Sequence, residues 1–499
     1  MVSSSTGVDQ RSVTSSELPP PCTAKPPSGV GRGPLVVDLD GTLIQSDLLI
    51  ESFLALFANK PFVALRTLAA LREGKAVFKT RIVDELVVDV ARLPYNGCVL
   101  AYIEAERAKG RPIYLASASD IRLVRAVSGH LGLFDGVLGS GEEVNLAGKT
   151  KAEALCERFG ERGFAYIGGD RVDLHVWSRC GEALVAGGTP RLLRQLRGTM
   201  PFAVSLDEGG SHWRDYVRAL RPHQWLKNIL VFAPATAGHV IVPSALNCTI
   251  AFLSFSFCAS AVYIVNDLLD LPSDREHPRK CRRPFASGAV PLIHGIAMVP
   301  ALLLASLLLA LMLTPTFLLV VGGYLALTTA YSLYLKRKII ADVMTLAILY
   351  ALRLVGGGVA AGVAISHWLE ALSMFLFLSL ALVKRCTELV ERVKSGQGDP
   401  AGRGYQLGDL PSLEAMAAAS GYLTALVMAL YLNSEAVTSL YRHPERLWLI
   451  CIAILFWISR IIIKTRRGEM NDDPVVFAVR DRVSLVTGLL CAFIVMASM

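Results

Sequence analysis

The second part of this chain is dominated by apolar segments long enough to cross a lipid bilayer. A membrane-spanning helix needs about twenty mostly apolar residues. From residue 228 onward, segments of roughly this length follow one another with short, mostly basic connections. We therefore expect residues 216–499 to form an all-α polytopic membrane bundle of about nine transmembrane helices. The predicted spans lie near residues 228–242, 247–267, 289–313, 316–335, 340–363, 368–385, 414–433, 446–463 and 483–498.

The residues before this region have the composition of a soluble domain. The chain has 499 residues, of which 53% are hydrophobic. Its mean hydropathy of +0.46 is too high for a protein that is soluble throughout. The first residues are rich in Ser, Pro and Gly and lack the apolar core of a signal peptide. We expect a disordered leader over 1–33, a soluble domain over 34–200, a linker over 201–215 and the membrane domain over 216–499.

The net charge of +8 does not require a nucleic-acid partner. Many Lys and Arg residues lie between predicted spans, where cytoplasmic loops of membrane proteins carry an excess of positive charge. The segments REHPRKCRRP, LKRK, VKRCTELVERVK and KTRRGE fall on one side, and the opposite connections at 314–315 and 366–367 contain no Lys or Arg. Only the connection with Arg442 and Arg446 runs against the rule. We expect a multi-pass protein of the inner or plasma membrane, with its N-terminal domain in the cytoplasm and its C-terminus outside.

In the soluble domain, a strand predicted at 34–37 ends in two aspartates separated by one residue. Asp38 and Asp40 point to the same side of an extended backbone, and Gly41 allows the chain to turn sharply. The carboxyl end of a strand is where an open α/β sheet presents its chemistry. We expect Asp38 to act as a nucleophile and Asp40 as a general acid and base.

This segment, Asp38-Leu39-Asp40-Gly41-Thr42-Leu43, resembles the first motif of the haloacid-dehalogenase (HAD) superfamily of phosphoryl-transfer enzymes. Two further pieces follow in the order of that superfamily. A strand predicted at 112–116 ends in Ser117, which resembles the phosphate-binding second motif, and Lys151 resembles the charge-neutralising lysine. The resemblance implies a Rossmannoid α/β fold with phosphatase activity.

The last HAD motif is less regular in this sequence. Superfamily members commonly carry a second acid four or five residues after the first, whereas Asp170 and Asp173 are three apart. The resemblance implies that Asp38, Asp40, Asp170 and Asp173 hold Mg²⁺, and the alternative is a domain that keeps the fold without turnover. We expect residues 46–100 to form a helical cap, although the basic and apolar stretch 57–81 is also suited to lipid headgroups.

Residues 266–288 combine acids and bases at the end of a predicted span. If the helix over 251–265 continues, Asp267, Asp270 and Asp274 share one face, because residues three and four apart are neighbours on a helix. Carboxylates bind hard cations, and guanidinium and ammonium groups bind phosphate oxygens. The stretch therefore predicts a Mg²⁺-diphosphate site, with a solvated charged loop as the alternative. The basic residues that follow the acids are His277, Arg279, Lys280, Arg282 and Arg283.

Further polar residues are expected on the same face of the membrane. A helical bundle with inward-facing acids and an opening to lipid suits a long isoprenoid whose charged head lies at the cytosolic rim. We therefore expect an amphiphilic substrate. For Lys336, simple anchoring by the positive-inside rule is an equal alternative. These polar residues are Tyr331, Lys336, Asp342, Arg353, Lys384, Arg385 and Glu388.

The NDxxDxxxD run at 266–274, the Tyr-Ser-x-x-Leu-Lys segment at 331–336 with the following Asp342, and the number of predicted spans together resemble the UbiA superfamily of intramembrane prenyltransferases. Within it, Arg-Pro-x-x-Trp-x-Lys-Asn at 221–228, the block at 274–288 and Lys384-Arg385 resemble decaprenyl-phosphate phosphoribosyltransferases. The second acid motif of the aromatic prenyltransferases is reduced here to Asp342, with Leu346 four residues later.

The resemblance implies transfer of 5-phosphoribosyl from phosphoribosyl diphosphate to a polyprenyl phosphate, a step toward a cell-envelope glycolipid. It implies that Asp267, Asp270 and Asp274 hold Mg²⁺, that Asp342 belongs to the catalytic set, and that the HAD-like domain removes the 5-phosphate of the product. The implied substrate-binding residues are Arg221, Lys227, Asn228, Asn266, Arg282, Arg283, Tyr331, Lys336, Arg353, Lys384 and Arg385.

Two other functions remain as alternatives at this point. The first is prenyl transfer from a polyprenyl diphosphate to an aromatic ring, using the same acids. The second is a transporter or scaffold, which would leave the clusters of acids and bases without a purpose. The oligomeric state is open, a homo-oligomer included.

Overall fold

The computed structural model describes residues 33–498 except 87, 142–144, 208–211, 401–402, 435–436, 438–440 and 471–472. Residues 1–32 of the expected leader and residues 208–211 of the expected linker lie outside the described residues. The chain divides into two compact units. The first, here called the α/β unit, comprises Met1–Tyr216 together with Asp267–His294, and the second, the helical unit, comprises Val217–Asn266 and Gly295–Met499.

The α/β unit is built on a six-stranded sheet in the order β3-β2-β1-β4-β5-β6. All neighbouring strands are parallel, and Val36 of β1 lies opposite Tyr114 of β2 and Tyr166 of β4. This order places the end of β1 between the ends of two neighbours, where open α/β sheets carry their sites. The strands are β1 (Leu35–Val37), β2 (Ile113–Asp120), β3 (Gly136–Ser140), β4 (Ala165–Gly168), β5 (Glu182–Val185) and β6 (Val204–Ser205).

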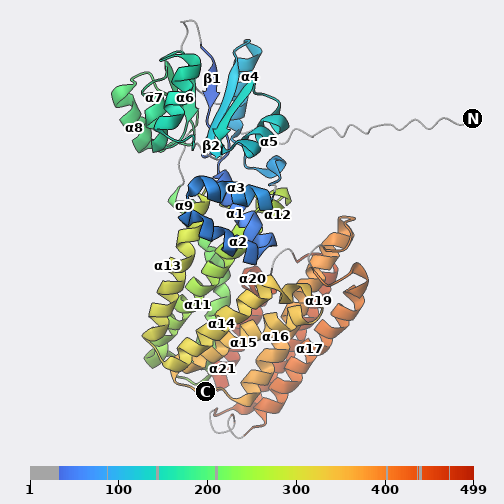
Figure 1. The fold of residues 1–499 in the computed structure, drawn as a ribbon. Coiled ribbons are helices and arrows are strands. Elements are labelled where there is room, and N and C mark those ends of the chain that lie inside the picture. Colours follow the sequence, from blue (N-terminus) through green and yellow to red (C-terminus); the bar gives the residue numbers. More distant parts are fainter. Residues whose placement is uncertain are drawn as a thin grey trace, which may run out of the picture. The chain divides into compact units, whose positions relative to one another are not determined.

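Helices cover both faces of the sheet (Figure 1). Because side chains alternate along a strand, Leu35 and Val37 pack into one core and Val36 into another. The first core is closed by α4 and α5, and the second by α6, α7 and α8. The expected α/β domain with a parallel sheet is therefore present. These helices are α4 (Gly97–Ala108), α5 (Ile121–Leu131), α6 (Lys149–Phe159), α7 (Leu174–Trp177), α8 (Pro190–Thr199) and the short η3 (Arg171–Asp173).

The segment predicted as a cap is helical and has a small core of its own. Leu56, Ala64, Phe78 and Ile82 are buried together. On the outer side of the same segment, apolar side chains are exposed, with Phe62 82% exposed. The cap consists of α1 (Leu48–Asn59), α2 (Pro61–Thr67), η1 (Leu68–Arg72), α3 (Lys75–Glu85) and η2 (Val90–Arg92). A further helix, α9 (Trp213–Leu220), leads out of the α/β unit.

The remaining helices are long and apolar. Among the described residues, six helices are long and apolar enough to cross a membrane, and a seventh span results if α20 and α21, which meet at 81°, count as one. In Figure 1, α14, α15, α16 and α17 run side by side, and consecutive members of this series pack together. The helices are α11 (Ile241–Leu269), α13 (Leu292–Leu311), α14 (Pro315–Leu333), α15 (Ala341–Ala361), α16 (His367–Lys394), α17 (Leu410–Leu432), α19 (Trp448–Arg466), α20 (Pro474–Arg480) and α21 (Arg482–Ser498).

The expected count of about nine spans is not confirmed. Over the predicted span 228–242, the chain forms η4 (Pro222–Phe232) and α10 (Ala233–Ala237), neither of spanning length. Proline at 222 and 234 restricts the backbone there and removes amide donors. At the predicted span 368–385, α16 is long enough but is not among the six, and it carries several charged residues, including Lys384 and Arg385.

A run of glycines brings η4 close to α15. A Cβ atom on Gly357 would lie 2.1 Å from the carbonyl oxygen of Val231, and one on Gly356 would lie 2.5 Å from the Phe255 ring. The side chains of η4 and α15 can meet only because these positions have no Cβ. The glycine run therefore positions two segments that carry predicted substrate-binding residues.

Candidate functional site

The acids of residues 267–288, here called the acid loop, do not lie on one continuous helix. The helix α11 ends at Leu269, Asp270 stands at the break, and α12 (Leu271–Glu276) begins after it. Proline at 272 lies in the first turn of α12 and favours a helix start, because its missing N–H would have no intrahelical partner there. The predicted continuation of the helix through Asp274 is therefore wrong.

Two of the three acids nevertheless converge. Asp267 and Asp274 are both buried, and one nitrogen of Arg283 lies 3.1 Å from Asp267 Oδ1 and 2.5 Å from Asp274 Oδ2. The carboxyl group of Asp270 is not part of this contact, and its main-chain oxygen accepts a hydrogen bond from the N–H of Asp274. The fold thus places two carboxylates around one positive charge.

This arrangement fits Mg²⁺. In the part of the chain that the structure describes, no group of three or more His, Cys, Asp or Glu side chains is placed to hold a metal ion. Mg²⁺ is commonly held by one or two carboxylates, and its remaining positions are taken by water and substrate phosphates. The Arg283 nitrogen occupies the position between the two carboxylates that such a cation would take. The other predicted basic residue of this group, Arg282, is exposed in η5 (Lys280–Arg282).

In the helical unit, Lys227 and Lys384 meet at an aspartate that the sequence analysis did not select. Asp473 Oδ2 lies 2.7 Å from Lys227 Nζ and 3.0 Å from Lys384 Nζ. Tyr350 of α15 donates a hydrogen bond to the same carboxylate. The sequence around Asp473 gives little indication of a site, since this residue lies in a polar segment before an apolar helix. It is also 246 residues away from Lys227 in the chain.

Asn228 and Arg353 form a second buried contact beside this one. Arg353 Nε donates to Asn228 Oδ1 at 2.7 Å, and Asn228 donates to Ser256 at 2.9 Å. Arg353 also donates to Tyr324 at 2.9 Å. These bonds join Asn228 of η4 directly to α11 and α15, and Arg353 in turn joins α15 to α14.

Asp342 and Arg385 form the third group of the helical unit. Asp342 is fully buried, and Arg385 binds it through Nε at 2.5 Å and Nη2 at 3.1 Å. Tyr331 donates to the same carboxylate at 2.9 Å, and Arg403 lies 3.5 Å away. Arg403 was not among the predicted residues. Asp342 is thus matched by cations from its own unit.

The other predicted binding residues have fewer contacts. Asn266 donates to Ser332 at 3.1 Å. Arg221 adopts a left-handed backbone with φ of 53° before Pro222, and its guanidinium group lies over the ring of Tyr263. Lys336 is half-buried in η6 (Leu335–Arg337). These positions neither support nor oppose the roles predicted for them.

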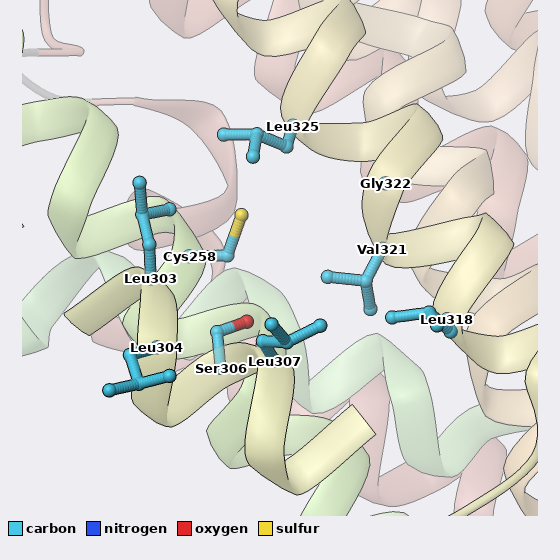
Figure 2. Close-up of a pocket in the computed structure, with 9 residues that line it drawn as sticks. All are labelled: Cys258, Leu303, Leu304, Ser306, Leu307, Leu318, Val321, Gly322 and Leu325. Carbon is cyan, nitrogen blue, oxygen red and sulfur yellow. The ribbon is translucent and has the colours of Figure 1, made fainter. Parts of the chain in front are cut away.

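An apolar pocket of about 260 Å³ opens between α11, α13 and α14. Figure 2 shows leucine and valine side chains from α13 and α14 facing each other across it, with Cys258 behind them. Its one hydroxyl, on Ser306, is satisfied by a hydrogen bond to the main-chain oxygen of Ser254 at 2.8 Å. The pocket is lined by Cys258, Leu303, Leu304, Ser306, Leu307, Leu318, Val321, Gly322 and Leu325.

The predicted nucleophile of the α/β unit lies at the carboxyl edge of the sheet. Lys151 Nζ lies 2.8 Å from Asp38 Oδ1. Burial raises the pKa of Asp38 to about 7, although the neighbouring Lys151 acts in the opposite direction. Asp40 accepts hydrogen bonds from Ser117 at 2.9 Å, Ser119 at 2.8 Å and the N–H of Leu48 at 2.7 Å. The structure therefore brings Asp38 together with Lys151, and Asp40 together with Ser117, at this edge of the sheet.

The two remaining acids of this site are used differently. Asp173 accepts hydrogen bonds from Tyr166 and from the N–H groups of Gly169 and Asp170. Asp170 caps η3 by accepting from the N–H of Arg171. A Cβ on Gly169 would lie 2.4 Å from the carbonyl oxygen of Ala186, so an acid does not fit at that position. Among the described residues, no three of the predicted acids Asp38, Asp40, Asp170 and Asp173 are placed to hold a metal ion together.

The chain is similar to one protein family and to several known proteins. Residues 229–480 match the UbiA prenyltransferase family. The chain is 37% identical over 463 residues to the uncharacterized protein y4nM of Sinorhizobium fredii, covering 92% of this chain and 90% of that protein. It is 40% identical over 181 residues to the decaprenyl-phosphate phosphoribosyltransferase of Mycobacterium tuberculosis, covering 35% of this chain and 59% of that protein. A solved UbiA homologue from Archaeoglobus fulgidus bound to DMAPP and Mg²⁺ gives a TM-score of 0.44 at 18% identity, covering 56% of this chain and 98% of that one.

Proposed function

Because this chain belongs to the UbiA prenyltransferase family, we propose that it transfers the 5-phosphoribosyl group of phosphoribosyl diphosphate to a polyprenyl phosphate. The similarity to the mycobacterial protein named decaprenyl-phosphate phosphoribosyltransferase supports this choice of substrates. One observation carries the proposal: two buried carboxylates, of Asp267 and Asp274, converge on a single cationic nitrogen. That geometry suits Mg²⁺ bound to a diphosphate.

The acid loop is assigned to the donor. Asp267 and Asp274, with Asp270 beside them, would hold Mg²⁺. When bound, this ion supplies positive charge for the leaving diphosphate as the anomeric C–O bond breaks. Arg282 and Arg283 would bind the remaining diphosphate oxygens, since guanidinium groups pair with phosphate in two-point contacts.

The basic residues of the helical unit are assigned to the phosphates of the substrates. A phosphate monoester oxygen is already an anion near neutral pH, so the acceptor needs no strong base. Lys227 and Lys384 would bind phosphate while Asp473 keeps the two ammonium groups near each other. The two ammonium groups would then offset the repulsion between the negatively charged donor and the negatively charged polyprenyl phosphate. Asn266, Arg221, Tyr331, Lys336, Arg353 and Arg385 complete the proposed binding set.

The apolar pocket between α11, α13 and α14 is assigned to the isoprenoid chain. Its volume of about 260 Å³ is in the range of a few isoprene units, and its lining is apolar apart from one satisfied hydroxyl. No particular chain length follows from it.

The transferase is tested by supplying purified full-length protein with one of two substrate pairs. The first pair is labelled phosphoribosyl diphosphate and polyprenyl phosphate, and the second is polyprenyl diphosphate and a hydroxybenzoate. We expect a labelled lipid from the first pair only, and none after chelation of divalent ions. Product from the second pair alone would contradict the proposal and favour transfer to an aromatic ring.

We also propose that the α/β unit is a HAD-like phosphatase, formed by residues 34–200, that removes the 5-phosphate from the lipid product. Asp38 would attack phosphorus while Asp40 protonates the departing ribose oxygen, and water would then release phosphate from the acyl phosphate. The Asp38–Lys151 contact and the bonds from Ser117 and Ser119 to Asp40 support these roles. Fusion to the membrane domain would keep the phosphatase near its lipid substrate.

The phosphatase step is tested with Asp38→Asn in the full-length protein and labelled donor. We expect the 5-phosphorylated lipid to accumulate while the transfer step continues at its normal rate. Ser178→Ala, in the same unit but on the surface, is the matched control. An unchanged product pattern in Asp38→Asn would mean that the α/β unit does not turn over this lipid.

The proposed orientation places the N-terminal domain in the cytoplasm and the C-terminus outside. This orientation requires that the chain cross the membrane an odd number of times. A tag at Met499 should then be accessible from outside the cytoplasm, and a tag at Met1 should not. Labelling of both tags from the same side would contradict the orientation.

A further inference from the structure

The acid loop is held by the cap of the α/β unit. Both belong to the same compact unit, which includes Asp267–His294 as well as the N-terminal domain. The central contact joins Arg275, the residue after Asp274, to Glu51 of α1, and both side chains are buried. Arg275 Nη2 lies 2.5 Å from Glu51 Oε1, and Nη1 lies 3.1 Å from Oε2. A two-point guanidinium–carboxylate pair of this kind fixes orientation as well as distance.

The same guanidinium group also ties the loop to itself and to a second cap segment. Arg275 Nε donates to the carbonyl oxygen of Ala286 at 3.0 Å, and Nη1 donates to that of Arg92 at 3.2 Å. One side chain therefore joins the two arms of the acid loop, α1 and η2. Beside it, Arg92 forms an ion pair with Glu276 at 2.8 Å.

A third contact is steric. Gly288, at the end of the acid loop, has a φ of +78°, and a Cβ at this position would lie 2.5 Å from Cβ of Gln45 and 2.6 Å from its carbonyl oxygen. Gln45 follows the first motif of the α/β unit by a few residues. The loop thus touches the N-terminal domain at three separate places.

These contacts matter because α12 is too short to hold its own conformation. A six-residue helix is unstable in isolation, so its place depends on tertiary contacts. Asp274 lies in this helix, next to Arg275. The first N–H of α1, on Leu48, is bound to Asp40 at 2.7 Å, and Glu51 follows one turn later. The helix α1 therefore contacts the predicted phosphatase site and the acid loop within a single turn.

We propose that Glu51 is a positioning residue for the transferase: through Arg275 it holds α12 so that the Asp274 carboxylate meets that of Asp267 at the metal position. The inference rests on the proposed function, because it takes the acid loop to be the Mg²⁺ site. It gives the N-terminal domain a role in the transfer step that does not depend on phosphatase turnover.

The test uses Glu51→Gln, Arg275→Gln and the double variant in the full-length protein. We expect each single change to raise the Mg²⁺ concentration for half-maximal transfer by about tenfold, a common size for coupling between sites. The rate at saturating Mg²⁺ should stay within about twofold of the wild type, because binding and not chemistry is affected. The double variant should match Arg275→Gln, because that change already removes the contact that Glu51→Gln breaks.

The matched control is Glu106→Gln. Glu106 is also buried and also pairs with an arginine, Arg111, at 2.8 Å, but it lies in α4. It should leave the Mg²⁺ dependence unchanged. If Glu51→Gln folds poorly, Glu51→Asp keeps the charge on a shorter side chain and should give an intermediate shift. A wild-type Mg²⁺ dependence in Glu51→Gln, or equal shifts in Glu51→Gln and Glu106→Gln, would overturn the proposal.

A second measurement separates this proposal from the proposed reaction. Mn²⁺ binding to the full-length protein with inorganic diphosphate is followed by electron paramagnetic resonance, and Asp274→Asn defines the signal that belongs to the acid loop. This assay requires no substrate. If the wild type transfers no phosphoribosyl group, the proposed function fails, and an about tenfold weaker Mn²⁺ affinity in Glu51→Gln alone still supports the positioning role. Equal affinities, or no Mn²⁺ signal from the acid loop, would overturn it.

Discussion

The acid loop and the Asp342 cluster both place buried aspartates against arginine, but in different proportions. In the acid loop, Asp267 and Asp274 share a single nitrogen of Arg283. In the helical unit, Asp342 has two nitrogens of Arg385, whose remaining nitrogen binds Glu388, together with the hydroxyl of Tyr331 and a more distant Arg403. The two aspartates of the acid loop thus share one guanidinium nitrogen, with Lys280 3.9 Å from Asp274, whereas Asp342 has a two-point contact with its arginine.

This difference in arginine contacts indicates which aspartates can bind a metal ion. Buried carboxylates that are already matched by arginine gain little from Mg²⁺, because another cation would have to displace an existing partner. Two carboxylates that share one cation repel each other and gain from a divalent ion. The sequence alone presents both groups as acid motifs, and only the geometry of their arginine contacts separates them.

The largest expected effect follows from removing a carboxylate of the acid loop. Asp274→Asn should lower transfer with Mg²⁺ by about a hundredfold or more, because it takes away a charge that stabilises the leaving group through the ion. Asp267→Asn should act in the same way. Lipid product formed from labelled donor is the readout, and elution as a single species in detergent checks the fold. Near-normal activity in either variant would refute the metal assignment.

The next effect concerns stability. Arg385→Gln leaves Asp342 buried without its main partner, and breaking a buried pair in this way costs about 3–5 kcal/mol. We expect a clear fall in the thermal unfolding temperature in detergent that added Mg²⁺ does not reverse. Recovery of this temperature by Mg²⁺ would show that Asp342 is a metal ligand and that the two groups are alike.

A smaller effect is expected from Arg283→Gln. Loss of its charged hydrogen bonds should cost about 1.5 kcal/mol without divalent ions. Here Mg²⁺ should restore the unfolding temperature. An ion that binds only the folded state stabilises that state, and the effect grows as the ion concentration rises above the dissociation constant. Arg283→Gln and Arg385→Gln are compared directly. If Mg²⁺ restores the unfolding temperature of both variants, or of neither, the acid loop and the Asp342 cluster do not differ in the way proposed.

The smallest effect is expected from Arg403→Gln. Arg403 is partly exposed and lies 3.5 Å from Asp342, so its contribution should be below about 1 kcal/mol. Unfolding in detergent and transfer activity should both stay near those of the wild type. A loss comparable to that of Arg385→Gln would mean that Asp342 depends on both arginines, and that the second group is short of positive charge as well.

Several elements of the fold could be predicted because their cause is local. The apolar run at 34–37 and the aspartates that follow it predicted a strand, and the structure places this strand in the parallel sheet. The apolar runs mark six of the membrane helices. The count of nine spans is not confirmed: residues 228–242 form only short helices, and α16, over the predicted span 368–385, is not among the six candidate helices. Arg385 of α16 is nevertheless buried, against Asp342 and Tyr331 of two other helices.

The sequence by itself determined which residues can do chemistry here: the acids of 266–274, the basic residues after them, and the aspartates at 38 and 40. Only the tertiary structure decided which of them meet. It broke the helix at Asp270, brought Asp473 to Lys227 across 246 residues, and paired Arg275 with Glu51 across 224. Periodicity and motifs describe neighbours along the chain, whereas the partner of a buried charge is selected by packing between distant segments, where an unpaired charge would cost several kilocalories per mole.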